Sequence, residues 1–218
     1  MFNNLREDIR SIKERDPAAR SGFEVFMLYS GLHAVMYYRM SHWFYMHRHY
    51  YIARRISQHA KFKTGVEIHP GATIGKGLFI DHGMGVVIGE TTEIGDYCTL
   101  YQGVTLGGTG KDKGKRHPTL GNNVMVGAGA KVLGPVILGD NVKVGANALV
   151  LMNVPANATA VGVPARVVRL NGRKVQRGGD LDQIHIPDPV SQEICKIDVE
   201  IDALSKRLNT LSREENKQ

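Results

Sequence analysis

Aliphatic side chains recur at every sixth position through the middle of the chain. One run begins at Ile68, a second begins at Ile88 after two extra residues, and a third begins at Leu120 after a longer insertion. An α-helix cannot keep such positions on one face, because six residues turn it by about 600°. The pattern instead predicts a solenoid in which each group of six residues, a hexad, forms one short strand and one turn, and three hexads complete a coil.

The aliphatic residue of each hexad is expected to face the inside of the coil. Glycine follows many of these residues, where it allows the backbone and the turn to approach closely. A small or apolar residue four positions further on, such as Cys98, should also be buried. The residues predicted to fill the interior are Ile68, Ile74, Ile80, Ile88, Ile94, Leu100, Leu106, Leu120, Val126, Val132, Leu138, Val144 and Val150.

The segments on either side of the hexads have helical patterns. Residues 1–62 are predicted to form helices, and most of the aromatic residues gather there, as expected of a helical core or a subunit contact. Residues 169–218 begin with turn-forming residues and continue with apolar residues spaced three and four apart, from Ile194 to Leu211. This spacing predicts a C-terminal helix, which either lies on its own subunit or forms a short coiled coil. The expected fold is α+β, with the solenoid at residues 63–168.

The composition excludes several broad classes of protein. The formal net charge is +7, but no nucleic-acid-binding motif accompanies it, so we expect an enzyme for anionic substrates and no nucleic-acid partner. The two cysteines, Cys98 and Cys195, give neither a disulfide framework nor paired metal-ligand spacing. The first residues lack the apolar core of a signal peptide, and the most apolar stretch, residues 23–43, contains charged side chains. We therefore expect a cytoplasmic protein without a membrane partner.

The hexads resemble those of the hexapeptide acyltransferases, whose coils form a left-handed parallel β-helix and usually assemble as trimers. Within that superfamily, residues 64–168 look closely like serine O-acetyltransferase. The Asp-His-Gly, Gly-Gly-Thr-Gly and Arg-His-Pro blocks together are specific to this family, whereas the hexads alone indicate only the superfamily. The matching stretches are Arg15-Asp16-Pro17-Ala18, Ile68-His69-Pro70, Asp81-His82-Gly83, Gly89-Glu90-Thr91, Val104-Thr105-Leu106-Gly107-Gly108-Thr109-Gly110, Arg116-His117-Pro118, Gly127-Ala128-Gly129-Ala130-Lys131 and Gly162-Val163-Pro164-Ala165-Arg166.

The resemblance implies a reaction and a set of site residues. The family transfers acetyl from acetyl-CoA to the hydroxyl of L-serine, on the way to L-cysteine, and cysteine commonly inhibits it. His82 matches the general base, and Glu67 stands where many members place the carboxylate that orients it. The residues that match serine-binding or cysteine-binding positions are Asp16, Asp81, Arg116 and His117, and those that match acetyl-CoA-binding positions are Gly107, Gly108, Thr109, Ala128 and Ala146. The resemblance implies no metal and no cofactor other than acetyl-CoA as co-substrate.

The chemistry of these residues agrees with the implied roles. A serine hydroxyl is a weak nucleophile, and histidine is a base of near-neutral pKa. His82 lies where two extra residues interrupt the hexads, so its turn should bulge outward, and Glu67 should lie about one strand spacing, roughly 4.8 Å, away. Arg116 can bind a carboxylate with two parallel hydrogen bonds, and Asp16 and Asp81 can bind an ammonium group. Cys98 is expected to be buried and inert, which predicts direct transfer without an acyl-enzyme.

The register also has a consequence for assembly. It sends His82 and the basic loop from Gly107 to Thr119 out of the coil at different corners, so we expect them to meet across a subunit boundary. A homotrimer is expected, with a dimer of trimers as the alternative, because the helical part is shorter than in members that pair two trimers. The family binds cysteine synthase through a terminal isoleucine, and this chain ends at Gln218, so that partnership is not expected.

Three other functions are compatible with parts of the sequence. The acetyl acceptor could be a sugar or antibiotic hydroxyl, which would not need Arg116 and paired aspartates. A metal-dependent hydratase of the carbonic-anhydrase type could use His69, His82 and His117, although the close histidine pair expected on its coils is missing. In a non-catalytic trimeric scaffold, His82 would be dispensable.

Overall fold

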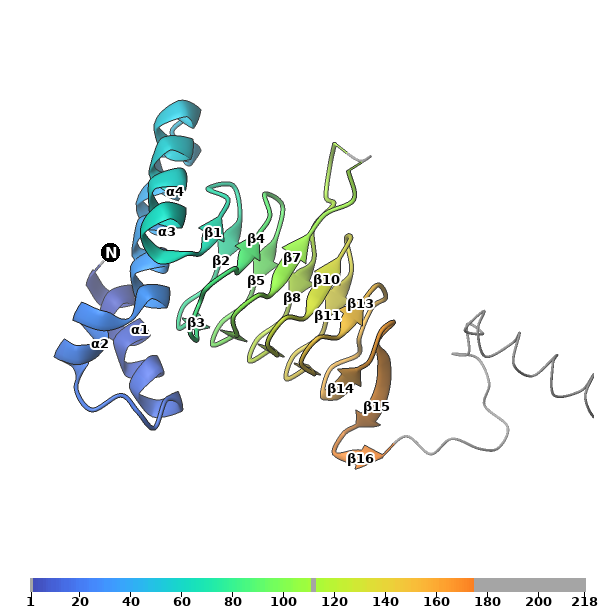
Figure 1. Ribbon diagram of the computed structural model, residues 1–218. Coiled ribbons are helices and arrows are strands. Elements are labelled where there is room, and N and C mark those ends of the chain that lie inside the picture. The colour runs from blue at the N-terminus through green and yellow to red at the C-terminus, as the bar shows by residue number, and fades with distance from the viewer. Residues whose placement is uncertain (1, 111–112, 175–218) are drawn as a thin grey trace, which may run out of the picture. The chain divides into compact units, whose positions relative to one another are not determined.

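The central part of the chain winds as a coil through three parallel sheets (Figure 1). The computed structural model describes residues 2–110 and 113–174. The first sheet contains β1 (Glu67–Ile68), β4 (Val87–Ile88), β7 (Thr105–Gly107), β10 (Lys131–Leu133) and β13 (Leu149–Val150). The second contains β2 (Thr73–Ile74), β5 (Glu93–Ile94), β8 (Thr119–Leu120) and β11 (Ile137–Leu138). The third contains β3 (Phe79–Ile80), β6 (Thr99–Leu100), β9 (Met125–Val126), β12 (Lys143–Val144) and β14 (Ala158–Val161).

The strand register confirms that three hexads make one coil. Lys131 pairs with Leu149, eighteen residues further along the chain. Phe79 pairs with Thr99, twenty residues further along, because the coil between them includes the two extra residues around His82. The coil has three corners, which we number by order: the first joins the first sheet to the second, the second joins the second to the third, and the third joins the third sheet to the first.

The interior of the coil is filled as the hexads predict. Every predicted inward-facing aliphatic residue is buried except Ile74, which is half-buried in the first coil. Cys98 is buried as well. The glycines allow neighbouring coils to stack: a Cβ atom on Gly95 would lie 2.6 Å from the carbonyl oxygen of Gly121 in the next coil. The hexad pattern is therefore the pattern of a packed core.

A ladder of asparagines lines the second corner. Asn123, Asn141 and Asn157 all have positive φ values, which asparagine tolerates better than most residues. The Asn123 side-chain amide donates to Asn141, and the Asn141 amide donates to Asn157, both at 2.9 Å. The ladder satisfies polar side chains at a tight turn and fixes the stacking of three coils.

Four helices precede the strands: α1 (Phe2–Arg15), α2 (Gly22–Leu28), α3 (Ser30–Met46) and α4 (Tyr50–Thr64). They cover the open end of the coil beside β1, β2 and β3 (Figure 1). An uncovered sheet edge exposes unpaired backbone groups. Here, the Ser57 and Tyr38 hydroxyls donate to the carbonyl oxygens of Ile68 and Ala72 at 2.7 Å, and His42 bonds the carbonyl of Pro70. The helices therefore cap the first coil.

Buried charged groups fix α1 to the same end of the coil. The carboxylate of Asp8 is fully buried, pairs with Arg39 of α3 and accepts the N–H of Gly77 at 3.0 Å. Arg15, the last residue of α1, donates to the carbonyl of Tyr97 at 2.9 Å and to the hydroxyl of Thr99 at 2.8 Å. The residue that follows, Asp16, is thereby held at a defined place beside the coil.

Two antiparallel strands, β15 (Arg166–Leu170) and β16 (Arg173–Lys174), extend the third sheet after β14 at the other end of the coil. These strands follow the last hexad and were not among the expected elements. The predicted C-terminal helix lies outside the described residues. No helix in the described part of the chain is long and apolar enough to span a bilayer.

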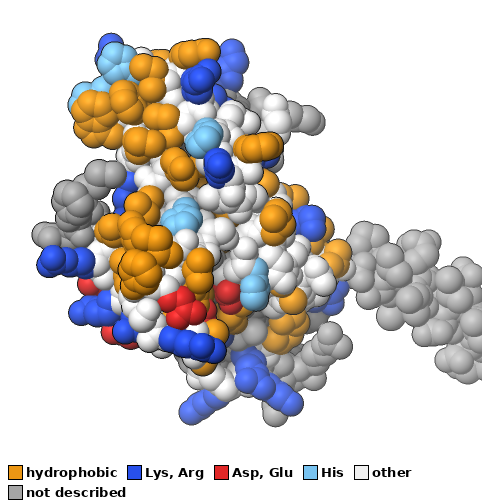
Figure 2. Space-filling view, turned by 60° about the vertical axis from the view of Figure 1, so that its left-hand side comes forward, with side chains coloured by type: hydrophobic (Ala, Val, Ile, Leu, Met, Phe, Trp, Pro, Cys, Tyr) orange, Lys and Arg blue, Asp and Glu red, His pale blue; other side chains and the backbone are white. Residues whose placement is uncertain are grey.

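Large hydrophobic side chains are exposed on the helices. Figure 2 shows them gathered over the helical end of the molecule. Phe62 is 88% exposed, Tyr51 is 79% exposed and Phe23 is 73% exposed. Apolar surface of this kind is typical of a face that contacts another protein.

Candidate active site

His82 projects from a tight turn at the third corner of the coil, directly after β3. The N–H of Gly83 donates to the carbonyl of Asp81 at 2.7 Å, and His82 between them has a φ of 60°. Its side chain is 70% exposed. The two extra residues that interrupt the hexads make this turn bulge, as predicted, and present the imidazole outside the core.

Two aspartates lie with His82 on this side of the molecule. The Asp81 carboxylate is 3.8 Å from Nε2 of His82. Asp16 accepts a hydrogen bond from the Tyr29 hydroxyl at 2.6 Å and one from the N–H of Ala18 at 2.8 Å. Burial, the hydrogen bond to Asp16 and the charges of Asp16 and Asp81 raise the pKa of Tyr29 to about 12. Tyr29 therefore feels the charges both of Asp16, which directly follows α1, and of Asp81, which precedes His82 in the turn at the third corner.

Tyr29 contacts the candidate residue Asp16, and the sequence analysis did not single it out. It lies between α2 and α3, and no spacing in the sequence links it to Asp16 or to the coil. Its contact becomes visible only when the helices are docked.

Arg116 and His117 lie at the first corner, at the end of the loop between β7 and β8. The guanidinium group of Arg116 bonds the Glu90 carboxylate at 2.5 Å. His117 is buried, and its Nδ1 accepts the N–H of Thr91 at 3.2 Å. Burial, followed by the charge of Arg116, lowers the pKa of His117. As the register predicts, this pair and His82 leave the coil at different corners.

The printed contacts of Glu67 are with the helices and with the neighbouring coil. Its strand, β1, pairs with β4, and Glu67 lies opposite Val87. Its carboxylate bonds Lys61 at 2.6 Å and Arg54 at 3.4 Å, both from α4, and the bond from Lys61 is the main reason that the pKa of Glu67 is lowered. Among the described residues, Asp81 has the carboxylate that lies within ion-pair distance of His82.

The residues expected to bind acetyl-CoA divide into two groups. Gly107, Gly108 and Thr109 lie at the start of the loop at the first corner, next to His117 and Arg116. Ala128 and Ala146 lie at the third corner, on the same side as His82. The N–H of Asn147 donates to the carbonyl of Ala128 at 2.8 Å, so these two positions stand in adjacent coils.

At the third corner, the turns of successive coils stack in a column that continues from the His82 turn toward the C-terminal end of the coil. The N–H of Gly103 donates to the carbonyl oxygen of Met84 at 2.9 Å, and the N–H of Gly129 donates to the carbonyl oxygen of Gln102 at 2.8 Å. With the bond from Asn147 to Ala128, these contacts run through successive coils.

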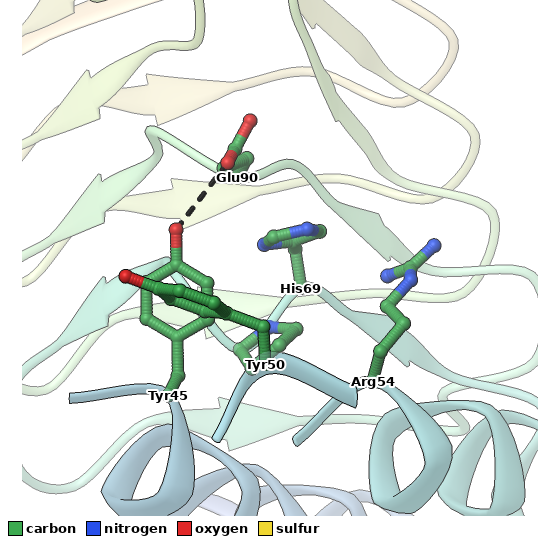
Figure 3. Close-up of a pocket in the computed structure, with 6 residues that line it drawn as sticks. Tyr45, Tyr50, Arg54, His69 and Glu90 are labelled. Carbon is green, nitrogen blue, oxygen red and sulfur yellow. Dashed lines mark hydrogen bonds between the residues drawn. The ribbon is translucent and has the colours of Figure 1, made fainter. Parts of the chain in front are cut away.

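A pocket of about 350 Å³ lies between the helices and the first corner, lined by Tyr45, Tyr50, Arg54, His69, Pro70 and Glu90. Figure 3 shows Tyr45, Tyr50 and Arg54 on the helices facing His69 and Glu90 on the coil. His69 Nδ1 accepts the N–H of Gly71 at 3.0 Å, and burial, then the charge of Arg54, lowers its pKa. Glu90 therefore joins this pocket to Arg116.

Two other expectations concern nucleophiles and metals. Burial raises the pKa of the Cys98 thiol to about 11, and its sulfur lies 3.1 Å from the carbonyl oxygen of Gly121, so Cys98 is buried as predicted and poorly suited to attack a thioester. His82 stands at a different corner from His69 and His117. The described residues contain no group of three or more histidine, cysteine or acidic side chains that could hold a metal ion.

Comparison with known proteins identifies the family. The family model for bacterial transferase hexapeptide (six repeats) matches residues 117–151. The serine acetyltransferase of Bacillus pumilus (strain SAFR-032) is 53% identical over 214 residues, which cover 98% of this chain and 98% of that protein. Two solved structures have a similar fold. Serine acetyltransferase of Neisseria gonorrhoeae in complex with serine has a TM-score of 0.75 and 38% identity, covering 77% of this chain and 69% of that chain. Serine acetyltransferase of Brucella abortus strain S19 in complex with coenzyme A has a TM-score of 0.75 and 40% identity, covering 77% and 67%.

The Bacillus pumilus relative matches nearly the whole length of the chain, and each of the two solved structures matches about three-quarters of it. The resemblance seen in the Asp-His-Gly, Gly-Gly-Thr-Gly and Arg-His-Pro blocks is thereby confirmed, and the chain belongs to the serine acetyltransferase family.

Proposed function

We propose a mechanism, centred on His82, by which the chain carries out the reaction of its family. The chain transfers the acetyl group of acetyl-CoA to the hydroxyl of L-serine, giving O-acetyl-L-serine and CoA, in L-cysteine biosynthesis. The observation that carries the mechanism is the exposed imidazole of His82 on its turn beside Asp81. We also infer that the coil winds left-handed, as the hexad period and the family match favour.

His82 acts as the general base. It takes the proton of the serine hydroxyl as the oxygen attacks the thioester carbonyl, and the imidazolium then returns that proton to the sulfur of the departing CoA. The Asp81 carboxylate, 3.8 Å from Nε2, stabilises the imidazolium. Glu67 is the second carboxylate that we assign to His82, and its bonds to Lys61 and Arg54 of α4 fix its position in the preceding coil.

Serine is a zwitterion, and the two halves of the site have the charges to bind it. Asp16 and Asp81 supply negative charge for its ammonium group on the His82 side. Arg116 supplies a guanidinium for its carboxylate, and the neutral His117 supplies an N–H donor. A sugar hydroxyl carries neither an ammonium group for the aspartates nor a carboxylate for the guanidinium, so it would make none of these charged contacts. The arrangement therefore favours serine over an uncharged acceptor.

Acetyl-CoA lies along the third corner, over Ala128 and Ala146, with its thioester at His82. The small side chains of this column leave room for the ligand, and the main-chain contacts between coils keep the column straight. Gly107, Gly108 and Thr109, at the first corner, belong to the half of the site that a neighbouring copy supplies. Acetyl-CoA is the co-substrate. His82 carries out both proton transfers, from the serine hydroxyl and to the sulfur of CoA.

The site is completed by a second copy of the chain in a homotrimer. Because His82 and Arg116 leave the coil at different corners, one copy presents His82 with Asp16 and Asp81, and its partner presents Arg116 and His117. This division supports the trimer expected from the family resemblance.

The proposed function is tested by measuring CoA release from acetyl-CoA with a panel of acceptors: L-serine, a sugar and an aminoglycoside. We expect release with L-serine only. The variant His82→Asn should lose at least about a hundred-fold in kcat, the contribution of a positioned general base. Asparagine suits this position because it tolerates the positive φ of His82.

The matched control is His47→Asn, which changes an exposed histidine on the helices. It should leave CoA release unchanged. Equal rates for His82→Asn and the wild-type protein, or faster release with another acceptor, would exclude the proposed function.

A further inference from the structure

The motif Gly89-Glu90-Thr91 matches the family but has no role in the mechanism above. It follows β4 at the first corner, and the end of the loop between β7 and β8 returns over it. The N–H of Thr92 donates to the carbonyl of Gly89 at 3.2 Å, which closes a turn and holds the motif rigid. Each of its three residues contacts Arg116 or His117.

Thr91 binds both residues through its hydroxyl group. Its Oγ1 accepts the backbone N–H groups of Arg116 and His117, each at 3.1 Å. The hydroxyl also lies 2.9 Å from Nδ1 of His117. A hydroxyl can accept two hydrogen bonds and donate one. The two backbone N–H groups occupy both acceptor sites, so the hydroxyl donates its proton to Nδ1 of His117.

These bonds fix the tautomer of His117. The backbone N–H of Thr91 can only donate, so Nδ1 of His117 must be an acceptor, and the proton of the neutral ring is on Nε2. His117 is therefore held as a donor through Nε2, which is the form that can bind a carboxylate oxygen.

Gly89 provides the space for the ring. A Cβ atom at Gly89 would lie 1.9 Å from Cδ2 of His117, and one at Gly108 would lie 2.9 Å from Cε1. The imidazole is thus enclosed between two backbone segments that have no side chains.

Glu90 holds the guanidinium group of Arg116. Burial alone would raise the pKa of Glu90, but the hydrogen bond and charge of Arg116, with the charge of His69, outweigh it and lower the pKa. The other carboxylate oxygen lies 3.4 Å from the hydroxyl of Tyr45, seen in Figure 3. Glu90 is therefore fixed from the helices while it orients Arg116.

We propose that Thr91 and Glu90 are positioning residues that hold His117 and Arg116 in the geometry that binds the carboxylate of serine. The inference rests on the proposed function, because it assumes that Arg116 and His117 bind serine. It adds Thr91 and Glu90 to the proposed serine site, where they act on the substrate only through His117 and Arg116.

The first test compares Thr91→Val with Thr91→Ser and Thr92→Val in the full chain. Thr91→Val keeps the shape of the side chain but removes the hydroxyl, and it should raise the KM for serine about ten-fold while the KM for acetyl-CoA stays within about two-fold. Thr91→Ser keeps the hydroxyl and should restore the KM for serine. Thr92→Val is the matched control, because the Thr92 hydroxyl is buried without a hydrogen-bond partner among the described residues, and it should leave both KM values unchanged.

A second readout does not depend on catalysis. The ¹⁵N resonances of the His117 ring, assigned by comparison with His117→Gln, should show the Nε2-protonated ring in the wild-type protein. In Thr91→Val, Nδ1 loses a donor and becomes easier to protonate, so the midpoint of the His117 titration should rise. An unchanged midpoint, together with an unchanged KM for serine, would overturn the proposal.

Glu90→Gln provides an independent variant. It should raise the KM for serine several-fold in the wild-type background and add little in the Arg116→Ala background, since both act on one interaction. If the increases in the KM for serine caused by Glu90→Gln and Arg116→Ala multiply in the double variant, the role of Glu90 is wrong. If Arg116→Ala raises the KM for serine but Thr91→Val and Glu90→Gln do not, this inference fails and the proposed function stands. If Arg116→Ala leaves that KM unchanged, the assignment of Arg116 itself is wrong.

Discussion

His82 and His117 have opposite surroundings. His82 is exposed on a turn with positive φ, so its ring is open to solvent and to a substrate. His117 is buried, and its Nδ1 accepts hydrogen bonds from Thr91. The same residue type is therefore proposed for two purposes, a base at the third corner and a fixed neutral donor at the first.

The burial of His117 and His69 predicts how stability depends on pH. The pKa of each is lowered in the folded protein, first by burial, from an ordinary value of 6.5. Above this value both rings are neutral in either state. Below it the unfolded chain binds protons that the folded chain does not, so the free energy of unfolding falls as the pH falls.

We therefore expect Tm to decrease between about pH 7.5 and about pH 5.5, measured by calorimetry. The double variant of His69→Gln and His117→Gln should show a smaller decrease, while His47→Asn should keep the wild-type slope. A Tm that rises on acidification over this range would contradict the argument.

Sequence predicts these residues to different extents. The exposure of His82 follows from two extra residues in a regular period, and the burial of Cys98 follows from its phase. The partners of Glu67 depend on where Lys61 and Arg54 fall when α4 docks, which no local pattern contains. Thr91 could be noticed only as part of a matched motif, because its bonds connect residues about 25 positions apart.

At the scale of elements, the docking of α3 against the coil depends on Gly31. A Cβ atom there would lie 2.1 Å from the carbonyl oxygen of Ile80 and 2.9 Å from its Cβ. Ile80 directly precedes Asp81, and the hydroxyl of Ser30 lies 3.5 Å from the carbonyl of His82. The start of α3 therefore supports the turn that carries the base.

We expect Gly31→Ala to lower the free energy of unfolding by ~1–3 kcal/mol, the usual cost of overpacking, and to lower kcat as the turn shifts. Denaturant unfolding and steady-state kinetics measure the two effects. Gly22→Ala is the matched control, because its Cβ would meet only the Ile9 side chain, at 3.2 Å. A Gly31→Ala variant as stable and active as Gly22→Ala would show that this contact is unimportant.

Hexads predict their strands well because one period encodes both the inward side chain and the turn. The sequence predicts strands less well beyond the last hexad, where the six-residue period stops. The antiparallel strands β15 and β16 follow the last hexad, and their pairing depends on contact with β14 rather than on a repeat. The asparagine ladder was also not predicted, because it needs equivalent corners of different coils to be aligned.

At the scale of the whole molecule, sharing of the site between subunits can be tested by co-expression. His82→Ala and Arg116→Ala should each be nearly inactive at low serine concentration. In mixed trimers, about a quarter of the sites would combine an intact His82 from one subunit with an intact Arg116 from its neighbour. We therefore expect co-expressed variants to regain up to about a quarter of wild-type activity per site.

Co-expression of His82→Ala with a second His82 variant, His82→Asn, is the control and should regain nothing. If the mixture of His82→Ala and Arg116→Ala also stays inactive although mixed trimers form, then both residues serve the same chain's site.

The caps at the two ends of the coil have a consequence for solubility. A stack of short parallel rungs could in principle go on adding rungs from other molecules and grow into a fibril. The hydroxyls of Ser57 and Tyr38 occupy carbonyl groups of the first rung, and β15 pairs antiparallel with β14 at the last. Strand-by-strand growth is therefore blocked at both ends of the described coil, and any association must use side chains instead of sheet edges.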